Sequence, residues 1–147
     1  MSNFFGGSSN NFELKIVPIS NLKAHELPDM IRVEKLECDM MHRGVLIRPI
    51  VVDRNTMVIL DGHCRCGALR RLGYSKIAVK FVDYNSDFIS VESWNGERIT
   101  KREVINAGLG GNLMMPKTSK HMFARKGKKI HISNMCKEVA FALDELL

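Results

Sequence analysis

The strongest constraint on the fold is an apolar strand that runs directly into a helix through a glycine. Residues 58–65 read Val-Ile-Leu-Asp-Gly-His-Cys-Arg. In this pattern the first amides of the helix lack intrahelical partners and point outward at the positive end of the helix dipole. Such a helix end binds anions, and Gly62 lets a phosphate approach the backbone closely. The alternative interpretation is a plain capped helix whose polar first turn faces solvent.

The polar side chains at this turn extend the same expectation. His63 and Arg65 would add positive hydrogen-bond donors to an anion site. Asp61 has three candidate roles, which are to orient His63, to cap the helix or to hold Mg²⁺. The sequence therefore predicts an anion-binding corner that follows a buried strand.

The rest of the chain alternates short strands with helices. A first strand is expected over Phe12–Ile19, and Asp29 and Gly44 are expected to cap and end a helix. The remaining pattern predicts strands at 47–52, 57–60, 77–82 and 89–94, helices beginning near 61 and at Thr100, an irregular or hairpin-like stretch to 137 and a final amphipathic helix over 138–147. This order predicts an α+β fold with one small mixed β-sheet and flanking helices.

Length and composition define the class of protein. The chain has 147 residues, 45% apolar and 26% charged, which excludes wholesale disorder and suits one domain. We expect a flexible leader at 1–11 and a single domain over 12–147. No apolar stretch is long enough for a membrane span and no secretory signal pattern is present, so no membrane partner is expected.

The cysteines and the charge distribution indicate compartment and partners. Four cysteines and nine methionines predict a reducing, cytoplasmic location, and the cysteine spacing does not favour a zinc site. The formal charge is +6, and no acidic residue occurs between Glu103 and Glu138. The basic segment there favours phosphate, a nucleotide or nucleic acid as a partner, or else forms a solvated basic hairpin.

Three stretches resemble the ParB N-terminal and sulfiredoxin-like superfamily. They are residues 16–23 (Ile-Val-Pro-Ile-Ser-Asn-Leu-Lys), 44–50 (Gly-Val-Leu-Ile-Arg-Pro-Ile) and 59–69 (Ile-Leu-Asp-Gly-His-Cys-Arg-Cys-Gly-Ala-Leu). Within this superfamily the chain is most similar to the free L-serine kinases. That likeness is carried by Lys-Ala-His-Glu at 23–26, Glu-Ser-Trp-Asn at 92–95 and Pro-Lys-Thr-Ser-Lys-His at 116–121.

The resemblance implies a kinase that transfers a phosphoryl group from ADP or ATP to free L-serine, with Mg²⁺. It implies that Glu26 is the general base and that Trp94 forms a wall of the serine pocket. Asp61 and His63 complete the implied catalytic set, and Asp61 would hold the metal. The implied phosphate-binding residues are Gly62, His63, Cys64 and Arg65, and the implied substrate-binding residues are His25, Trp94, Lys117, Thr118, Ser119, Lys120 and His121. Cys64 stands where the family usually has a second histidine.

Three other functions fit parts of the sequence. A ParB-like nucleotide- or DNA-binding module would explain the basic segment, but it predicts a Gly-x-Arg-Arg box where this chain has Gly-His-Cys-Arg. A sulfiredoxin-type reductase needs a cysteine directly after the glycine, whereas Cys64 comes one place later, although a helix N-terminus would lower the pKa of that thiol. A non-catalytic interaction protein with the same fold is the third alternative.

Overall fold

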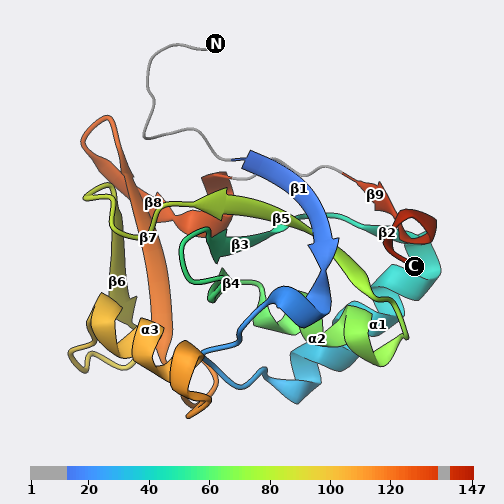
Figure 1. Cartoon of the computed structure of the whole chain (residues 1–147), viewed down its shortest axis with the longest axis horizontal. Helices are drawn as coiled ribbons and strands as arrows, with labels where there is room; N and C mark the ends of the chain where they lie inside the picture. The colour runs from blue at the N-terminus through green and yellow to red at the C-terminus, as the bar shows by residue number, and fades with distance from the viewer. Residues whose placement is uncertain (1–12, 136–139) are drawn as a thin grey trace.

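The computed structural model describes residues 13–135 and 140–147, and a four-stranded mixed sheet lies at its centre (Figure 1). Strands β5 and β3 are parallel, while β1 pairs with β5 and β4 pairs with β3 in the antiparallel sense. The order is β1-β5-β3-β4, with bounds Glu13–Pro18 for β1, Ile50–Asp53 for β3, Ile59–Asp61 for β4 and Lys76–Val82 for β5. The predicted mixed sheet is thereby confirmed.

The central strands β3 and β5 of this sheet are buried on both faces, which explains the apolar run at the start of β3, whereas the edge strand β1 is largely exposed. Ile50 and Val52 point into one core, whereas Val51 points into the other, because side chains alternate along a strand. Ile59 and Leu60 of β4 divide between the two cores in the same way. The end of β4 therefore lies between two packed layers, and the predicted anion-binding corner begins there.

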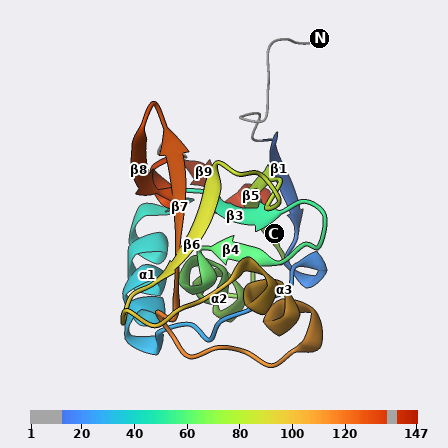
Figure 2. The same ribbon diagram turned by 90° about the vertical axis from the view of Figure 1, so that its left-hand side faces the viewer.

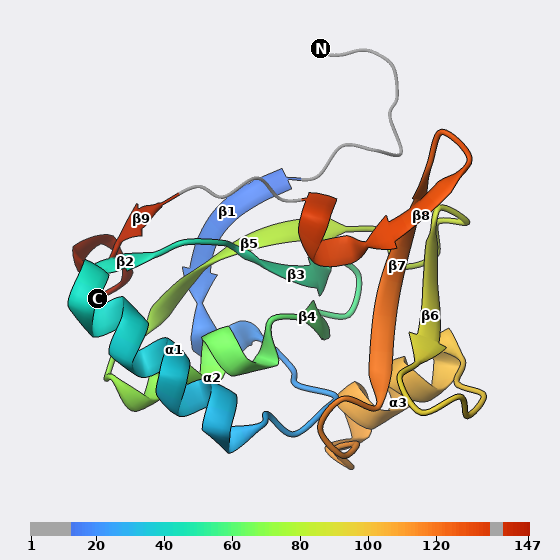
Figure 3. The same ribbon diagram turned by 180° about the vertical axis from the view of Figure 1, so that it is seen from behind.

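Helices α1 (Met30–Arg43) and α2 (His63–Arg71) cover the first face and pack against each other (Figure 3). The predicted caps of α1 are confirmed, since Asp29 Oδ1 accepts the N–H of Ile31 at 3.1 Å and Gly44 is left-handed at φ 71°. Val33 and Met40 of α1 pack into the same core as Leu69 of α2. Together these two helices bring the start of α2 to the side of the sheet where β4 ends.

A three-stranded sheet and helix α3 (Lys101–Gly110) pack against the second face (Figure 2). The sheet contains β6 (Ile89–Ser93), β7 (Ser119–Arg125) and β8 (Lys128–His131) in that order. The predicted capping box of α3 is confirmed, because Thr100 and Glu103 each accept the other's backbone N–H. The basic segment thus forms the β7–β8 hairpin, which agrees with the hairpin-like stretch expected there.

The structure differs from the sequence prediction at the C-terminus and in the number of sheets. Over its described residues, 140–147, the predicted final helix is wrong: β9 (Phe141–Ala142) pairs with β2 (Val45–Leu46), and a 3₁₀ turn follows at Leu143–Leu146. Pairing with β2 and burial of Leu143 and Leu146 outweigh the amphipathic pattern. Two further 3₁₀ turns cover Ile19–Asn21 and Ile132–Met135.

The first predicted strand is observed as β1, and the predicted leader at 1–11 lies outside the described residues. Where one sheet was expected, the described residues form three, because strand patterns do not specify which strands pair. Among the helices that the structure describes, none has both the length and the apolar character needed to cross a bilayer.

Candidate functional site

A cavity of about 690 Å³ opens beside the end of β4 and the start of α2. Its walls come from segments far apart in the sequence: the loop after β1, helix α1, the first turn of α2, the end of β6 and the start of β7. The predicted site residues that line it are Glu26, Asp61, Gly62, His63, Cys64, Arg65, Trp94, Lys117, Ser119 and His121. The fold therefore brings most of the predicted site into one cavity.

The helix corner, residues 61–65, forms one wall of the cavity, and the chain turns from β4 into α2 at Gly62. Gly62 precedes α2 in a left-handed conformation at φ 105°, and a Cβ there would lie 2.3 Å from Ile50 Cγ2. Within the described chain no side chain caps the start of α2. Arg65 Nη2 lies 3.2 Å from Asp61 Oδ2, and both side chains are largely buried. The corner thus presents uncapped amides beside an arginine, as an anion site requires.

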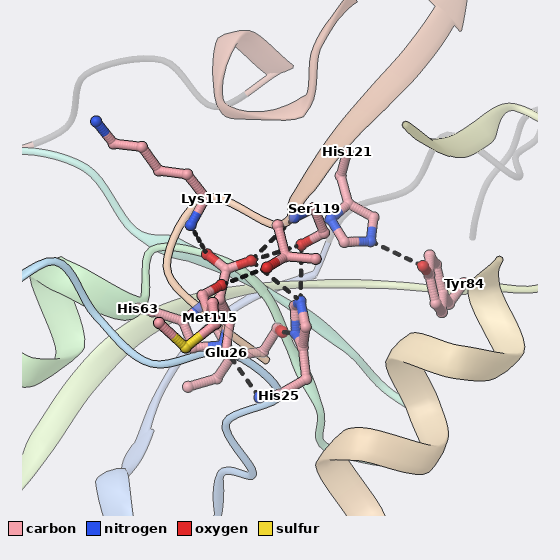
Figure 4. Close-up of polar contacts among 10 residues, drawn as sticks. His25, Glu26, His63, Tyr84, Met115, Lys117, Ser119 and His121 are labelled. Carbon is pink, nitrogen blue, oxygen red and sulfur yellow. Dashed lines mark hydrogen bonds and ion pairs between the residues drawn. The ribbon is translucent and has the colours of Figure 1, made fainter. Parts of the chain in front are cut away.

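Glu26 forms another part of the cavity wall, where its carboxylate accepts hydrogen bonds from Lys117 and Ser119 (Figure 4). Its Oε2 accepts the N–H of Lys117 at 3.1 Å, and its Oε1 accepts the N–H of Ser119 at 3.0 Å. The side chain is 14% exposed. Burial raises the pKa of Glu26, and the hydrogen bonds from Ser119 and Lys117 oppose that shift. The carboxylate is therefore fixed in place and more basic than an ordinary glutamate, which suits a general base.

Backbone pairing joins the loop of Glu26 to this turn. Leu27 N–H donates to Met114 O and Met114 N–H donates to His25 O, both at 2.8 Å. Lys117 is left-handed at φ 62°, an uncommon conformation for a residue with a side chain. Thr118 Oγ1 donates to Met115 O at 2.5 Å, which closes the turn. These contacts point the backbone N–H groups of Lys117 and Ser119 at Glu26.

Three histidines, His25, His63 and His121, lie close together near Glu26. The ring centroids of His25 and His63 are 4.6 Å apart, and those of His25 and His121 are 5.8 Å apart. Burial lowers the pKa of His25 to about 4 and that of His121 to about 3, and it holds the pKa of His63 well below its ordinary value. The prediction that His63 adds positive charge is therefore wrong near neutral pH. His63 Nε2 instead accepts the backbone N–H of His25 at 3.2 Å.

Trp94 forms the outer rim of the cavity, at the end of β6. Its side chain is half exposed, and Lys120 Nζ lies 4.7 Å from the ring centroid. Lys120 also pairs with Glu92 at 3.8 Å. His25, Thr118 and Lys120 do not themselves line the cavity. These three residues support the wall residues rather than face the space that a ligand would fill.

Several lining residues were missed by sequence reasoning. They are Asp29, Arg32, Arg48, His131 and Ser133. Arg32 lies on the helix that Asp29 caps, and His131 ends β8. No motif separates these residues from ordinary surface residues, because their place at the cavity depends on how α1 and the second sheet pack. The two arginines add positive charge to the cavity beyond Arg65.

The structure does not support Cys64 as a thiolate nucleophile. Its Sγ lies 3.8 Å from the carbonyl oxygen of Asp29. Burial raises the pKa of the Cys64 thiol, so the lowering expected from the helix N-terminus is wrong. A protonated thiol is a poor nucleophile, and this removes the main chemical argument for a sulfiredoxin-type reductase.

Asp61 is the candidate metal ligand at the cavity. Among the described residues there is no group of three or more His, Cys, Asp and Glu side chains arranged to hold a metal ion. Mg²⁺, however, is commonly bound through one or two carboxylates together with substrate phosphates. The single carboxylate of Asp61, beside the anion-binding start of α2, fits that kind of site.

The sequence is similar to that of known proteins over little more than half of the chain. No family model matches the chain. It is 36% identical over 86 residues to a ParB-like protein of Sulfolobus acidocaldarius, covering 58% of this chain and 43% of that protein. It is 26% identical over 83 residues to an ATP-dependent L-serine kinase of Staphylothermus marinus, covering 54% of this chain and 33% of that protein. The chain thus spans less than half the length of these curated relatives.

Two solved structures share the fold across nearly the whole chain. A conserved hypothetical protein from Pyrococcus furiosus superposes with a TM-score of 0.76 at 14% identity, covering 92% of this chain and 97% of that one. A free serine kinase in complex with AMP superposes with a TM-score of 0.74 at 14% identity, covering 91% and 93%. The predicted fold class and the resemblance to ParB-like proteins and free serine kinases are therefore confirmed.

Proposed function

We propose that this protein transfers a phosphoryl group from ADP or ATP to free L-serine and so forms O-phosphoserine. The observation that carries the proposal is the cavity with Glu26 on one wall and the uncapped start of α2 on the other. A buried carboxylate can act as the base and an anion-binding helix end can hold the phosphates, and both are parts that phosphoryl transfer to an alcohol uses. The similarity to L-serine kinases supports the choice of substrate.

In this mechanism the nucleotide phosphates bind at the first turn of α2. The amides after Gly62 and the guanidinium of Arg65 neutralise their charge. His63 is a neutral ring there, and Cys64 contributes its backbone. Asp61 would hold Mg²⁺ together with phosphate oxygens, and that ion would supply further charge neutralisation.

The acceptor serine lies between Trp94 and the turn before β7. Lys117 and His121, which line the cavity, would bind the serine carboxylate or the incoming phosphate, and Lys120 would hold the Trp94 ring in place. Glu26 takes the proton of the serine hydroxyl as its oxygen bonds to phosphorus. Because phosphoryl transfer needs little covalent help, position and charge carry most of the rate.

The test is incubation with L-serine, Mg²⁺ and either ADP or ATP, with O-phosphoserine detected by ³¹P NMR. Glu26→Gln keeps the size of the side chain but removes the base, so kcat should fall by about 100-fold or more while nucleotide binding persists. Glu34→Gln, an exposed change on α1, is the matched control and should keep wild-type turnover. Equal turnover of Glu26→Gln and wild type would remove Glu26 as the base.

A second candidate function is a ParB-like nucleotide- or DNA-binding module without kinase activity. The ParB-like relative and the basic β7–β8 hairpin favour it. Filter binding to duplex DNA at increasing salt tests this function, because phosphate contacts give a steep loss of affinity with salt. Salt-sensitive DNA binding without O-phosphoserine formation would replace the kinase proposal.

A further inference from the structure

The hydroxyl of Ser119 stands between two hydrogen-bond acceptors (Figure 4). Its Oγ lies 3.0 Å from Glu26 Oε1 and 2.8 Å from His25 Nε2. His25 Nδ1 lies 2.6 Å from the carbonyl oxygen of Ile59, which can only accept. Nδ1 therefore carries the single ring proton of neutral His25, and Nε2 presents a lone pair to Ser119.

Glu26, Ser119 and His25 form a chain of three hydrogen-bonded side chains, which we call the proton chain, and its protons can be counted. When Glu26 is ionised and His25 is neutral, Ser119 has one proton for two contacts, so one contact sets two lone pairs against each other. One added proton removes the conflict. Glu26 then donates to Ser119 Oγ, and Ser119 donates to His25 Nε2. The chain is therefore fully hydrogen-bonded only after it has gained a proton.

Burial makes the unfavourable contact between two lone pairs at Ser119 costly. His25 is 0% exposed, so bulk water does not reach Nε2 to relieve it. The ring is also fixed, since Ile59 O binds Nδ1 and the backbone N–H of His25 donates to His63 Nε2. The low pKa of His25 keeps the added proton on Glu26.

We propose that His25 is a positioning residue that acts through the Ser119 hydroxyl: it competes for the Ser119 proton, weakens the hydrogen bond that stabilises ionised Glu26, and so raises the proton affinity of Glu26 and prepares it as the base. This inference rests on the proposed function. In the transfer step the serine oxygen bonds to phosphorus while the bond from phosphorus to the leaving nucleotide oxygen breaks, and that oxygen keeps the electron pair. The serine O–H bond breaks, its proton forms an O–H bond on Glu26, and Ser119 turns its own proton toward His25.

Other titratable side chains lie against this chain and must be assigned before any titration is interpreted. They are His63 and Cys64 from α2, His121 from β7 and Lys117 from the turn. His63 and His121 can each be followed by their own ¹⁵N resonances, and a second sample with ¹³C-labelled cysteine and lysine follows Cys64 and Lys117. The first test uses ligand-free wild-type protein with ¹³C-labelled glutamate carboxyls and ¹⁵N-labelled histidines.

In that titration the Nε2 resonance of His25 should shift with the same midpoint as the Glu26 carboxyl, because Ser119 reverses its donation when Glu26 gains its proton. His25 Nδ1 should stay protonated throughout. An Nε2 resonance that does not respond to the protonation of Glu26 would overturn the proposal, and this measurement requires no variant to fold.

A double-mutant cycle provides the second test. His25→Asn places an amide near the Nδ1 position and removes Nε2, so Ser119 donates to ionised Glu26 without a rival acceptor. The midpoint of Glu26 should fall by about 0.5 to 1 pH unit. In a Ser119→Ala background the same His25→Asn change should leave the midpoint of Glu26 unmoved. An equal fall in both backgrounds would show that the effect does not pass through the Ser119 hydroxyl.

The acidic limb of the kcat/KM profile should move with the Glu26 midpoint in His25→Asn, because that limb reports the base of the free enzyme. The two proposals can fail separately. The titrations are made without nucleotide or serine, so a failed proton chain leaves O-phosphoserine formation standing. Absent O-phosphoserine formation removes the kinase proposal and leaves the titrations valid.

Discussion

The two walls of the cavity are built by different kinds of interaction. The helix corner is local: Asp61 pairs with Arg65 four residues later, and Gly62 provides the turn between them. The wall of Glu26 is not local, because its donors Lys117 and Ser119 lie more than ninety residues away in the sequence. A short sequence motif can thus specify the anion-binding helix corner, whereas the position of the base depends on contacts that form only in the assembled fold.

This difference implies that the two walls respond differently to disturbance. The Glu26 wall depends on neutral, buried histidines and on the pairing of Met114 with the loop of Glu26. The helix corner depends on the close contact of Gly62 with Ile50. Changes that charge the histidines should therefore break the first wall, and changes that add bulk at Gly62 should break the second.

The largest expected effect is loss of stability in mild acid. His25 and His121 are buried with pKa values of about 4 and about 3, below the ordinary 6.5. Because the folded pKa values are depressed, the unfolded state binds more protons as pH falls below 6.5. His25 and His121 together should lower the free energy of unfolding by up to about 3 kcal/mol per pH unit near pH 5, at about 1.4 kcal/mol each, and His63 acts in the same direction.

Urea denaturation at a series of pH values measures this slope. His121→Asn should reduce it by about 1.4 kcal/mol per pH unit near pH 5, because one of the buried titrating groups is gone. His42→Asn, an exposed change on α1, is the matched control and should leave the slope unchanged. A free energy of unfolding that stays flat between pH 6 and 4 in wild type would contradict the assignment of neutral buried histidines.

The next effect concerns the helix corner. In Gly62→Ala the new Cβ would lie 2.3 Å from Ile50 Cγ2, at a φ of 105° that L-residues avoid. Strain and overpacking together should cost about 2 to 5 kcal/mol of unfolding free energy. Gly96→Ala is the matched control: Gly96 has a φ of 82° with nothing within 4 Å of the added Cβ, so it should cost about 1 to 2 kcal/mol. Equal losses in the two variants would mean that the contact with Ile50 is unimportant.

The same contrast explains how much of the molecule could be predicted. Asp29 and Gly44, Thr100 and Glu103, and the corner at Gly62 are local signals, and each is found where the sequence places it. Local periodicity predicts an amphipathic helix over the C-terminal segment 138–147. Its true partner is β2, almost one hundred residues earlier, and local periodicity carries no information about such a partner.

The candidate site divides in the same way. The corner residues could be derived from the strand, glycine and helix pattern, and the resemblance added Glu26 and the late loop. Arg32, Arg48 and His131 could not be predicted, because the packing of α1 and β8 around the cavity places them there. Nor could the neutral state of His63, since its burial and its closeness to His25 and His121, which both lower its pKa, arise only in the assembled fold.

The smallest expected effect is on the alkylation rate of Cys64, which compares the influence of the helix N-terminus on the thiol with that of burial. The start of α2 should stabilise a thiolate, whereas burial should oppose it, and burial is the larger cause of the raised pKa. Cys64 should therefore be alkylated by iodoacetamide more slowly than the exposed Cys38 at pH 8. Peptide mass spectrometry over time measures both sites in one sample, so Cys38 is an internal control. Faster alkylation of Cys64 would mean that the helix dipole outweighs burial, and the reductase alternative would then regain its chemical argument.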